Sequence, residues 1–320
     1  MTKINDKQFV SIDWGTTHLR IYLVQTNNGQ VVFESRSKGG IKEIHLRAQD
    51  SHLNREEFFV RHLLEELQPL SHLMDGDEAL VISGMASSSI GIRNLPYASL
   101  PFPCNGSGIY YQPLEVPKNK FQAFLISGVR AKEDVMRGEE TQVIGLADSL
   151  QHEDQFLLIL PGTHSKHIMI RAGQIFDFKT FMTGEIFDVL LKNSILKDSV
   201  RVSEISSLTL SAFTDGVLHS GEHLMLNELF KIRARDLFQF TSPENNYYYL
   251  SGLMIGQELR NLISFERPIY LAASGDLLTL YSVAAKILKI NIEIIAEDIL
   301  NKAVITGHLK ILNNIISSIT

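Results

Sequence analysis

Apolar and polar residues alternate in the first part of the chain in a way that is typical of a β-meander. An apolar run at 9–12 ends at the polar turn 13–17, which reads Asp-Trp-Gly-Thr-Thr. Two further alternating segments, 19–24 and 30–35, flank a turn at 28–29. Alternation with period two is expected for strands whose two faces meet different surroundings. This part of the sequence therefore predicts a strand, a tight polar turn and two more strands.

A second stretch repeats this arrangement about half a chain later. The apolar run 155–160 leads into a turn at 161–164, Pro-Gly-Thr-His, and the segments 167–170 and 174–178 flank an Ala-Gly turn at 172–173. Two similar meanders in one chain indicate an internal duplication. We therefore expect two α/β domains, at residues 1–147 and 148–320, and 320 residues are enough for each to have its own core.

The rest of the pattern alternates between helical and strand periodicity. Helices are predicted over 55–67, from near 138, within 180–191, around 219–230 and 251–262, and over 277–288 and 303–319. Strands are predicted over 79–82, 121–130, 268–273 and 292–295.

Composition narrows the class of protein. The net charge of −6 argues against nucleic acid as the main partner, because binding to a phosphate backbone needs a basic face. A single cysteine, Cys104, excludes an internal disulfide and a cysteine-rich zinc site. No signal peptide and no apolar run of ~20 residues is recognised. We expect a cytoplasmic protein without a membrane partner, and a homodimer is compatible with the sequence.

The first turn has the composition of a phosphate site. Gly15 permits a sharp turn and a close approach to a ligand, while Thr16 and Thr17 can donate hydrogen bonds to phosphate oxygens. Asp13 would repel a phosphate and is expected to hold Mg²⁺ instead, through water. Taken alone, the stretch is equally compatible with an ordinary hairpin turn.

The second turn favours the phosphate interpretation. Gly162, Thr163 and His164 follow their strand as Gly15 to Thr17 follow theirs, and Lys166 adds a positive charge. The second copy has Leu160 or Pro161 opposite Asp13, so only the first copy carries the carboxylate for a metal. One triphosphate and one Mg²⁺ bound by two turns would produce this asymmetry.

Two adjacent carboxylates, Glu139 and Glu140, lie at the expected start of a helix. The positive end of the helix dipole favours anions there, and one of the two could act as a general base toward a substrate hydroxyl. The alternative is an acidic first helical turn with no chemistry. A third loop, at Ser274 and Gly275, follows a strand and opens a helix, where small residues allow a base or a ribose to approach the backbone.

An irregular arm follows the strand 79–82. It begins with the small polar run 83–89 and continues through a Pro-rich segment, which places Ser87, Arg93 and Tyr97 where a substrate could contact them. Arg93 and Arg20 are candidates for binding an anionic substrate, because a guanidinium can pair with a carboxylate through two hydrogen bonds. A solvated loop, with Arg93 in contact with water alone, is the alternative.

In this order the features resemble the superfamily of sugar kinases, hexokinase, heat-shock 70 and actin. The runs 13–17, 135–142, 160–166 and 180–185, together with Leu19-Arg20, are similar to those of the 2-dehydro-3-deoxygalactonokinase family over nearly the whole chain. The resemblance implies two ribonuclease-H-like domains around a cleft, with ATP and Mg²⁺. It also implies transfer of the γ-phosphoryl group to the C6 hydroxyl of a 2-keto-3-deoxy sugar acid in galactonate breakdown.

The resemblance also implies roles for individual residues. A carboxylate at a comparable helix start serves as the base in related kinases, which favours Glu139 over Glu140, and Lys166 would neutralise charge on the transferring group or the sugar acid. The run 87–92, Ser-Ser-Ser-Ile-Gly-Ile, departs from the Gly-Ser-Arg-Gln-Gly-Trp-like stretch of the family. The identity of the sugar acid is therefore left open. A phosphohydrolase and an ATP-gated binding protein are the alternatives from other classes.

Overall fold

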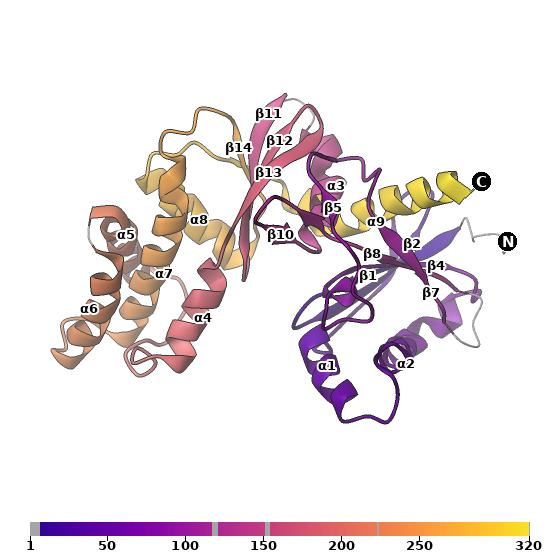
Figure 1. The fold of residues 1–320 in the computed structure, drawn as a ribbon. Helices are drawn as coiled ribbons and strands as arrows, with labels where there is room; N and C mark the ends of the chain where they lie inside the picture. The colour runs from indigo at the N-terminus through magenta and orange to yellow at the C-terminus, as the bar shows by residue number, and fades with distance from the viewer. Residues whose placement is uncertain (1–6, 117–120, 151–153, 223, 320) are drawn as a thin grey trace. The chain divides into compact units, whose positions relative to one another are not determined.

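The computed structural model describes residues 7–116, 121–150, 154–222 and 224–319 (Figure 1). Its strands are β1 (Gln8–Trp14), β2 (Leu19–Gln25), β3 (Val31–Ser37), β4 (Ala79–Gly84), β5 (Ala98–Ser99), β6 (Phe102–Pro103), β7 (Tyr111–Leu114), β8 (Gln122–Ile126), β9 (Val129–Arg130), β10 (Val135–Met136), β11 (Gln155–Leu160), β12 (Ser165–Arg171), β13 (Gln174–Phe181), β14 (Ile269–Leu271) and β15 (Glu293–Ile294). Its α-helices are α1 (Ile41–Gln49), α2 (Arg55–Leu67), α3 (Glu139–Leu146), α4 (Thr183–Asn193), α5 (Ser207–Glu222), α6 (Met225–Leu237), α7 (Pro243–Leu259), α8 (Gly275–Ile287) and α9 (Glu297–Ile319).

The contacts between residues divide the chain into two units. Unit 1 comprises Met1–Asp154, Arg171–Asp177 and Asp298–Thr320, and unit 2 comprises Gln155–Ile170 and Phe178–Glu297. The expected division at 147/148 differs from this at 148–154, at 171–177 and in the last helix, α9, which belongs to unit 1 almost throughout. The amphipathic pattern of 303–319 predicts a helix but carries no information about which sheet the helix covers.

Glycines explain why α9 packs in unit 1. A Cβ on Gly145 of α3 would collide with the carbonyl oxygen of Ala303, and a Cβ on Gly307 would collide with that of Thr141. The absence of side chains at these two positions lets α3 and α9 cross with their backbones in contact. His308 adds a hydrogen bond of 2.7 Å between its Nδ1 and the Ser11 hydroxyl of β1. The C-terminal helix therefore ties α3 to the first strand.

The sheet of unit 1 has the order β3-β2-β1-β4-β8-β7. β1 is antiparallel to β2 and parallel to β4, and β4 is parallel to β8. On one face, α1 and α2 bury a core that includes Trp14, Ile44 and Phe59 (Figure 1). Ring packing of Trp14 against Phe59, with centroids 5.6 Å apart, fixes α2 against the end of β1. The end of β1, which carries Asp13, is thus held rigidly.

The strands of the second meander, β11 to β13, and the two strands β14 and β15 have the same order in the sheet of unit 2 as β1 to β3, β4 and β8 have in unit 1. β15, β14, β11, β12 and β13 follow one another, with β14 parallel to both β11 and β15. The boundary between the units passes through β13, whose residues 174 and 175 pair with β6 inside unit 1. Both predicted meanders are present, and the expected fold class, two ribonuclease-H-like α/β units, is confirmed.

Several element boundaries were predicted correctly and others were not. Helix 55–67 and strand 155–160 match α2 and β11. The range predicted as helical around 219–230 is divided between two helices, since it contains the end of α5 and the start of α6. The helix predicted at 251–262 is the second half of α7, which begins eight residues earlier and is buried on most sides. A helix buried on most sides has no clear apolar stripe, so periodicity does not delimit it.

Among the described residues, no helix is both long enough and apolar enough to cross a membrane.

Candidate functional site

The first Gly-Thr turn is exposed at the end of β1 and is supported from behind by α1. The Gly15 N–H donates to the His18 carbonyl at 2.9 Å, and the N–H groups of Ile41 and Lys42 donate to the carbonyls of Gly15 and Thr16. The side chains of Thr16 and Thr17 are exposed. The predicted phosphate-binding turn is therefore present, with its hydroxyl groups accessible to a ligand.

Asp13 lies beside this turn and is paired with Arg20. Arg20 Nη1 donates to Asp13 Oδ2 at 2.7 Å, and the Asp13 side chain is only 15% exposed. Burial raises the pKa of Asp13, the charge of Arg20 acts against that rise, and the charge of Glu139 adds to it. Arg20 was expected to bind the substrate, but the structure places it on the proposed metal carboxylate.

α3 begins next to the ends of β1 and β4 because two glycines meet there. Gly84 and Gly138 have positive φ angles of 82° and 113°, and a Cβ on Gly138 would lie 3.3 Å from the Gly84 Cα. Larger residues could not adopt this crossing without strain. Glu139, the first residue of α3, is thereby brought close enough to Asp13 for its charge to raise the pKa of Asp13.

The two adjacent carboxylates have different surroundings. Glu139 is partly exposed, and its Oε2 accepts a hydrogen bond of 2.9 Å from the Arg137 backbone N–H. Glu140 is completely buried, and both of its oxygens accept from the Gly138 N–H at 2.9 and 2.8 Å. Glu140 therefore caps its own helix, while Glu139 is the one of the pair that a ligand could reach.

The burial of Glu140 predicts a pH dependence of stability. Burial raises the pKa of Glu140 from 4.5 to about 8, and the charge of Glu139 adds to the rise. A carboxyl group with a raised folded-state pKa stabilises the fold below its unfolded pKa and loses that contribution as pH rises through the folded pKa. The free energy of unfolding should therefore fall between about pH 4.5 and 8. Denaturant titrations across this range should show a weaker pH dependence in Glu140→Gln, and an unchanged dependence would contradict the assignment.

The substrate arm is organised around an arginine that sequence reasoning did not single out. Arg137 is 9% exposed, and its Nη1 donates to the carbonyl and the hydroxyl of Ser87, at 2.6 and 2.5 Å. Its guanidinium carbon lies 4.1 Å from the centre of the Tyr97 ring. Ser87 and Tyr97, which were both predicted to contact the substrate, thus both contact the Arg137 side chain. The feature of the sequence that could have indicated Arg137 is its position directly before Gly138-Glu139.

Arg93 has a different environment from the one expected. Its Nε and Nη2 form two hydrogen bonds with the carboxylate of Glu56, at 3.0 and 2.7 Å, and its Nη1 donates to the Gln112 side chain at 3.0 Å. A guanidinium that is paired with a carboxylate in this way already has its preferred partner. Arg93 therefore ties the arm to α2 in this structure, which corrects the alternative of an arginine in contact with water alone, while its contact with a substrate stays a prediction.

The second Gly-Thr turn is exposed in unit 2, where the start of α4 supports it. The Glu185 N–H donates to the Thr163 carbonyl at 3.0 Å, and the Glu185 carboxylate lies 2.7 Å from His164 Nε2. Gly184 allows this contact, since a Cβ there would lie 2.6 Å from the Gly162 carbonyl oxygen. Lys166 is buried, and its ammonium donates to the His164 carbonyl at 3.0 Å.

A buried carboxylate, Glu258 of α7, connects the strand after this turn to three other elements. Glu258 Oε1 accepts from the Ser165 hydroxyl at 2.6 Å and lies 3.0 Å from His167 Nε2. Its Oε2 accepts from the hydroxyls of Thr183 and Tyr281. Burial alone would raise the pKa of Glu258, but these hydrogen bonds outweigh it and hold the pKa below its usual value. Glu258 lies far from its partners in sequence, and periodicity gave no sign of this role.

Replacing Glu258 should loosen the second turn. In Glu258→Gln an amide NH₂ takes the place of one oxygen and faces two donors, so we expect the free energy of unfolding to fall by ~2–4 kcal/mol and ATP to bind more weakly. Denaturant unfolding and calorimetric ATP titration measure both effects. Glu244→Gln, which removes a partly exposed carboxylate near the start of the same helix, is the matched control. Equal stability of the two variants would exclude the anchoring role.

A cavity of about 150 Å³ adjoins the second turn. It is lined by Gly162, Thr183, Gly184, Phe187, Tyr247, Tyr248, Ser251, Met254, Ile255, Asp276, Leu277, Leu280 and Tyr281. Aromatic and apolar walls with a few polar groups suit a purine. The expected adenosine loop, Ser274 and Gly275, directly precedes the lining residues Asp276 and Leu277. The aromatic wall from α7 was not predicted.

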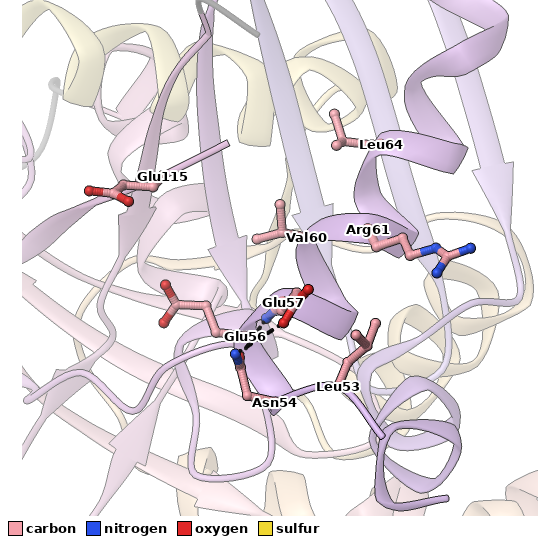
Figure 2. Close-up of a pocket in the computed structure, with 8 residues that line it drawn as sticks. All are labelled: Leu53, Asn54, Glu56, Glu57, Val60, Arg61, Leu64 and Glu115. Carbon is pink, nitrogen blue, oxygen red and sulfur yellow. Dashed lines mark hydrogen bonds between the residues drawn. The ribbon is translucent and has the colours of Figure 1, made fainter. Parts of the chain in front are cut away.

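A larger pocket in unit 1, of about 600 Å³, lies along α2. Figure 2 shows its lining residues, which include the carboxylates of Glu56, Glu57 and Glu115 and one basic residue, Arg61. Asn54 caps the helix by accepting from the Glu57 N–H at 2.9 Å. An excess of carboxylates repels ATP and sugar acids, and none of the predicted site residues lines this pocket.

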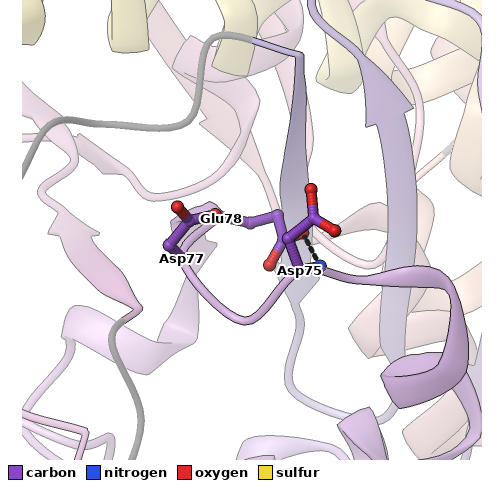
Figure 3. A group of neighbouring side chains, drawn as sticks. All are labelled: Asp75, Asp77 and Glu78. Atoms are coloured by element: carbon purple, nitrogen blue, oxygen red, sulfur yellow. Dashed lines mark hydrogen bonds between the residues drawn. The ribbon is translucent and has the colours of Figure 1, made fainter.

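The acidic cluster Asp75, Asp77 and Glu78 (Figure 3) has the composition of a metal site. It lies at the end of the sheet opposite to the one that carries Asp13. It precedes β4, whereas Asp13 is paired in parallel register with Ser83 near the end of that strand. The Glu78 carboxylate accepts from the N–H groups of Asp75 and Gly76 at 2.6 and 3.0 Å. These bonds close a turn, which accounts for the buried position of the Glu78 carboxylate.

Comparisons with known proteins agree with one another. The family model described as 2-keto-3-deoxy-galactonokinase matches residues 13–309. The chain is 32% identical to a 2-dehydro-3-deoxygalactonokinase of Escherichia coli (strain K12), over 91% of this chain and 94% of the relative. It is 29% identical to a "Probable 2-dehydro-3-deoxygalactonokinase" of Rhizobium meliloti (strain 1021), over 91% and 92%. A crystal structure of a Sinorhizobium meliloti protein assigned to this activity superimposes with a TM-score of 0.81 at 29% identity, over 95% and 96%.

Proposed function

Because the chain belongs to the 2-keto-3-deoxy-galactonokinase family, and so is a phosphotransferase with an alcohol group as acceptor, we propose that it transfers the γ-phosphoryl group of ATP to the C6 hydroxyl of 2-dehydro-3-deoxy-galactonate. The observation that carries the proposal is that the start of α3, at Glu139, packs beside the end of β1, which carries Asp13: Gly138 contacts Gly84, and Gly84 pairs with Trp14. A kinase needs a group that holds the metal and a base that accepts the hydroxyl proton, and these two carboxylates are suited to the two roles.

The chain's contribution to the reaction is mainly positioning and charge neutralisation. Glu139 accepts the proton of the attacking hydroxyl, since Glu140 is buried beneath its helix. Gly15, Thr16 and Thr17 in unit 1, and Gly162, Thr163 and His164 in unit 2, donate hydrogen bonds to phosphate oxygens. Lys166 adds a positive charge behind the second turn.

The adenosine moiety belongs in the cavity of unit 2. The rings of Phe187, Tyr247 and Tyr248 are suited to contact with the base, and Asp276 can accept hydrogen bonds from a ribose. Ser274 and Gly275 precede this wall without side chains large enough to obstruct the ligand. This placement leaves the phosphates next to Gly162, which lines the same cavity.

The residues at the end of β1 fit Mg²⁺. Asp13 is a carboxylate that a second negative charge, Glu139, disfavours, and a divalent cation relieves such repulsion. Hard oxygen donors are the ligands that this ion prefers. When bound, Mg²⁺ would supply positive charge for the phosphates, and Asp13 would hold it through water.

The proposed partners are ATP and a small sugar acid, and the net charge of −6 supports this over a nucleic acid. A cytoplasmic location and a homodimeric state belong to the same proposal.

A panel of sugar acids tests the proposal. With ATP and Mg²⁺, 2-dehydro-3-deoxy-galactonate should give the highest kcat/KM for ADP formation, and ³¹P–¹³C coupling in the product should place the phosphate on C6. A higher kcat/KM for another sugar acid would replace the substrate while keeping the reaction. Phosphate release that does not depend on a sugar acid would identify a phosphohydrolase, and ATP binding without turnover on any acid would identify a binding protein.

A further inference from the structure

The side chain of Arg137 is buried together with polar groups of the substrate arm. Its Nη1 is held by Ser87, its Nη2 donates to the Leu95 carbonyl at 3.2 Å, and its Nε lies 3.4 Å from the Tyr97 hydroxyl. Ser87 is fully buried and Tyr97 is partly exposed. The guanidinium therefore lies at the base of the arm, with Tyr97 between it and solvent.

The positive charge of Arg137 has no carboxylate partner. In the part of the chain that the structure describes, no Asp or Glu oxygen forms an ion pair with its guanidinium, and the contact with Glu139 is made by the Arg137 backbone. Among the influences on the pKa of Glu140, the charge of Arg137 is the smallest. A buried charge without a counterion is costly, and a bound anion removes that cost.

The two arginines that the sequence suggested for an anionic substrate differ from Arg137 in this respect. Arg20 is paired with Asp13, and Arg93 is paired with Glu56, each at 2.7 Å. Both of these side chains are also more exposed, at 43% and 37%. Of these three arginines, Arg137 is thus the one whose guanidinium has no carboxylate partner among the described residues.

Two hydrogen-bond donors remain available beside the guanidinium. Arginine has five N–H groups, and the interactions described use two on Nη1, one on Nη2 and the one on Nε. One Nη2 hydrogen is left. The hydroxyl hydrogen of Tyr97 likewise has no acceptor among the described residues. Two donors next to an uncompensated charge are what a carboxylate requires.

We propose that Arg137 and Tyr97, supported by Ser87, form the binding site for the carboxylate of the sugar acid, so that Arg137 makes the enzyme specific for acids over neutral sugars. This inference rests on the proposed function. It places the acid end of the substrate on Arg137 and the reacting hydroxyl, at the other end of the carbon chain, within reach of Glu139. Arg137 and Glu139, which are separated by Gly138 alone, would then set the distance between the two ends.

The test compares two substrates on the same variants. The first is 2-dehydro-3-deoxy-galactonate, and the second is the 3-deoxyhexulose in which a hydroxymethyl group replaces the carboxylate. For Arg137→Met we expect kcat/KM for the acid to fall ~10²- to 10³-fold and kcat/KM for the neutral sugar to change within a few-fold. Arg137→Lys should recover part of the activity on the acid, because it restores the charge without the planar donor geometry.

The controls separate binding from folding. Arg130→Gln removes an exposed guanidinium from the neighbouring strand β9 and should leave both substrates unaffected. Thermal unfolding and ATP binding report whether each variant is folded. Equal losses on the two substrates would assign Arg137 a structural role in the arm and overturn the inference, as would an unchanged kcat/KM for the acid. Absence of activity on any sugar acid in the parent protein would instead refute the proposed function.

Discussion

Glu139→Gln should lower turnover by ~10²- to 10⁴-fold and change ATP affinity little, because the variant keeps the size and hydrogen bonding of the side chain but loses the proton acceptor. Glu139 is the partly exposed member of the acidic pair, and its charge acts on Asp13. Turnover with saturating substrates, together with calorimetric ATP binding, measures the two quantities separately.

Glu140→Gln is the matched comparison. Both Glu140 oxygens accept from the Gly138 N–H beneath the helix, so this variant should alter stability and its pH dependence more than the chemical step. If both variants turn over within a few-fold of the parent, the proton leaves by another route and the role of α3 is wrong. A greater loss in Glu140→Gln at unchanged stability would reverse the two assignments.

Asp13→Asn should lower turnover by ~10²- to 10³-fold at limiting Mg²⁺, because the charge that holds the ion is lost while the shape of the side chain is kept. The concentration of Mg²⁺ that gives half-maximal rate should rise. The fold should persist, since the Asp13 pair with Arg20 is partly exposed and such pairs contribute little to stability. A Mg²⁺ titration of turnover checks the prediction.

Asp75→Asn serves as the control for this measurement. It removes the exposed carboxylate of the acidic cluster at the other end of the sheet (Figure 3) and should leave the Mg²⁺ dependence unchanged. A shift in Asp75→Asn, or normal activity of Asp13→Asn at limiting Mg²⁺, would move the metal away from β1.

Features that depend on neighbouring residues could be predicted from the sequence. The two meanders, α2 and the start of α3 at Glu139 follow from alternation, helical periodicity and a glycine before an acidic turn. The turns at Gly29 and Gly173 follow from residues that tolerate the positive φ angles of 67° and 70° found there. The two exposed Gly-Thr turns belong to the same class, because a strand that ends in small polar residues has few alternatives.

Features that depend on distant residues were decided by the tertiary structure. Glu139 and Glu140 are chemically identical neighbours in the sequence, and only the packing of α3 buries one and leaves the other accessible. Arg20 and Arg93 became partners of Asp13 and Glu56, since a guanidinium pairs with whichever carboxylate the fold brings near.

The sequence by itself thus determined the two duplicated units and the segments that carry the chemistry. Tertiary structure alone decided which carboxylate a ligand can reach, which arginine keeps an uncompensated charge, and that α9 closes unit 1 through Gly145 and Gly307. The physical reason is that backbone propensity and periodicity act over a few residues. Burial, ion pairing and hydrogen bonding between side chains depend on groups that are distant in sequence, and the hydrogen-bonded Ser11 and His308 are almost the whole chain apart.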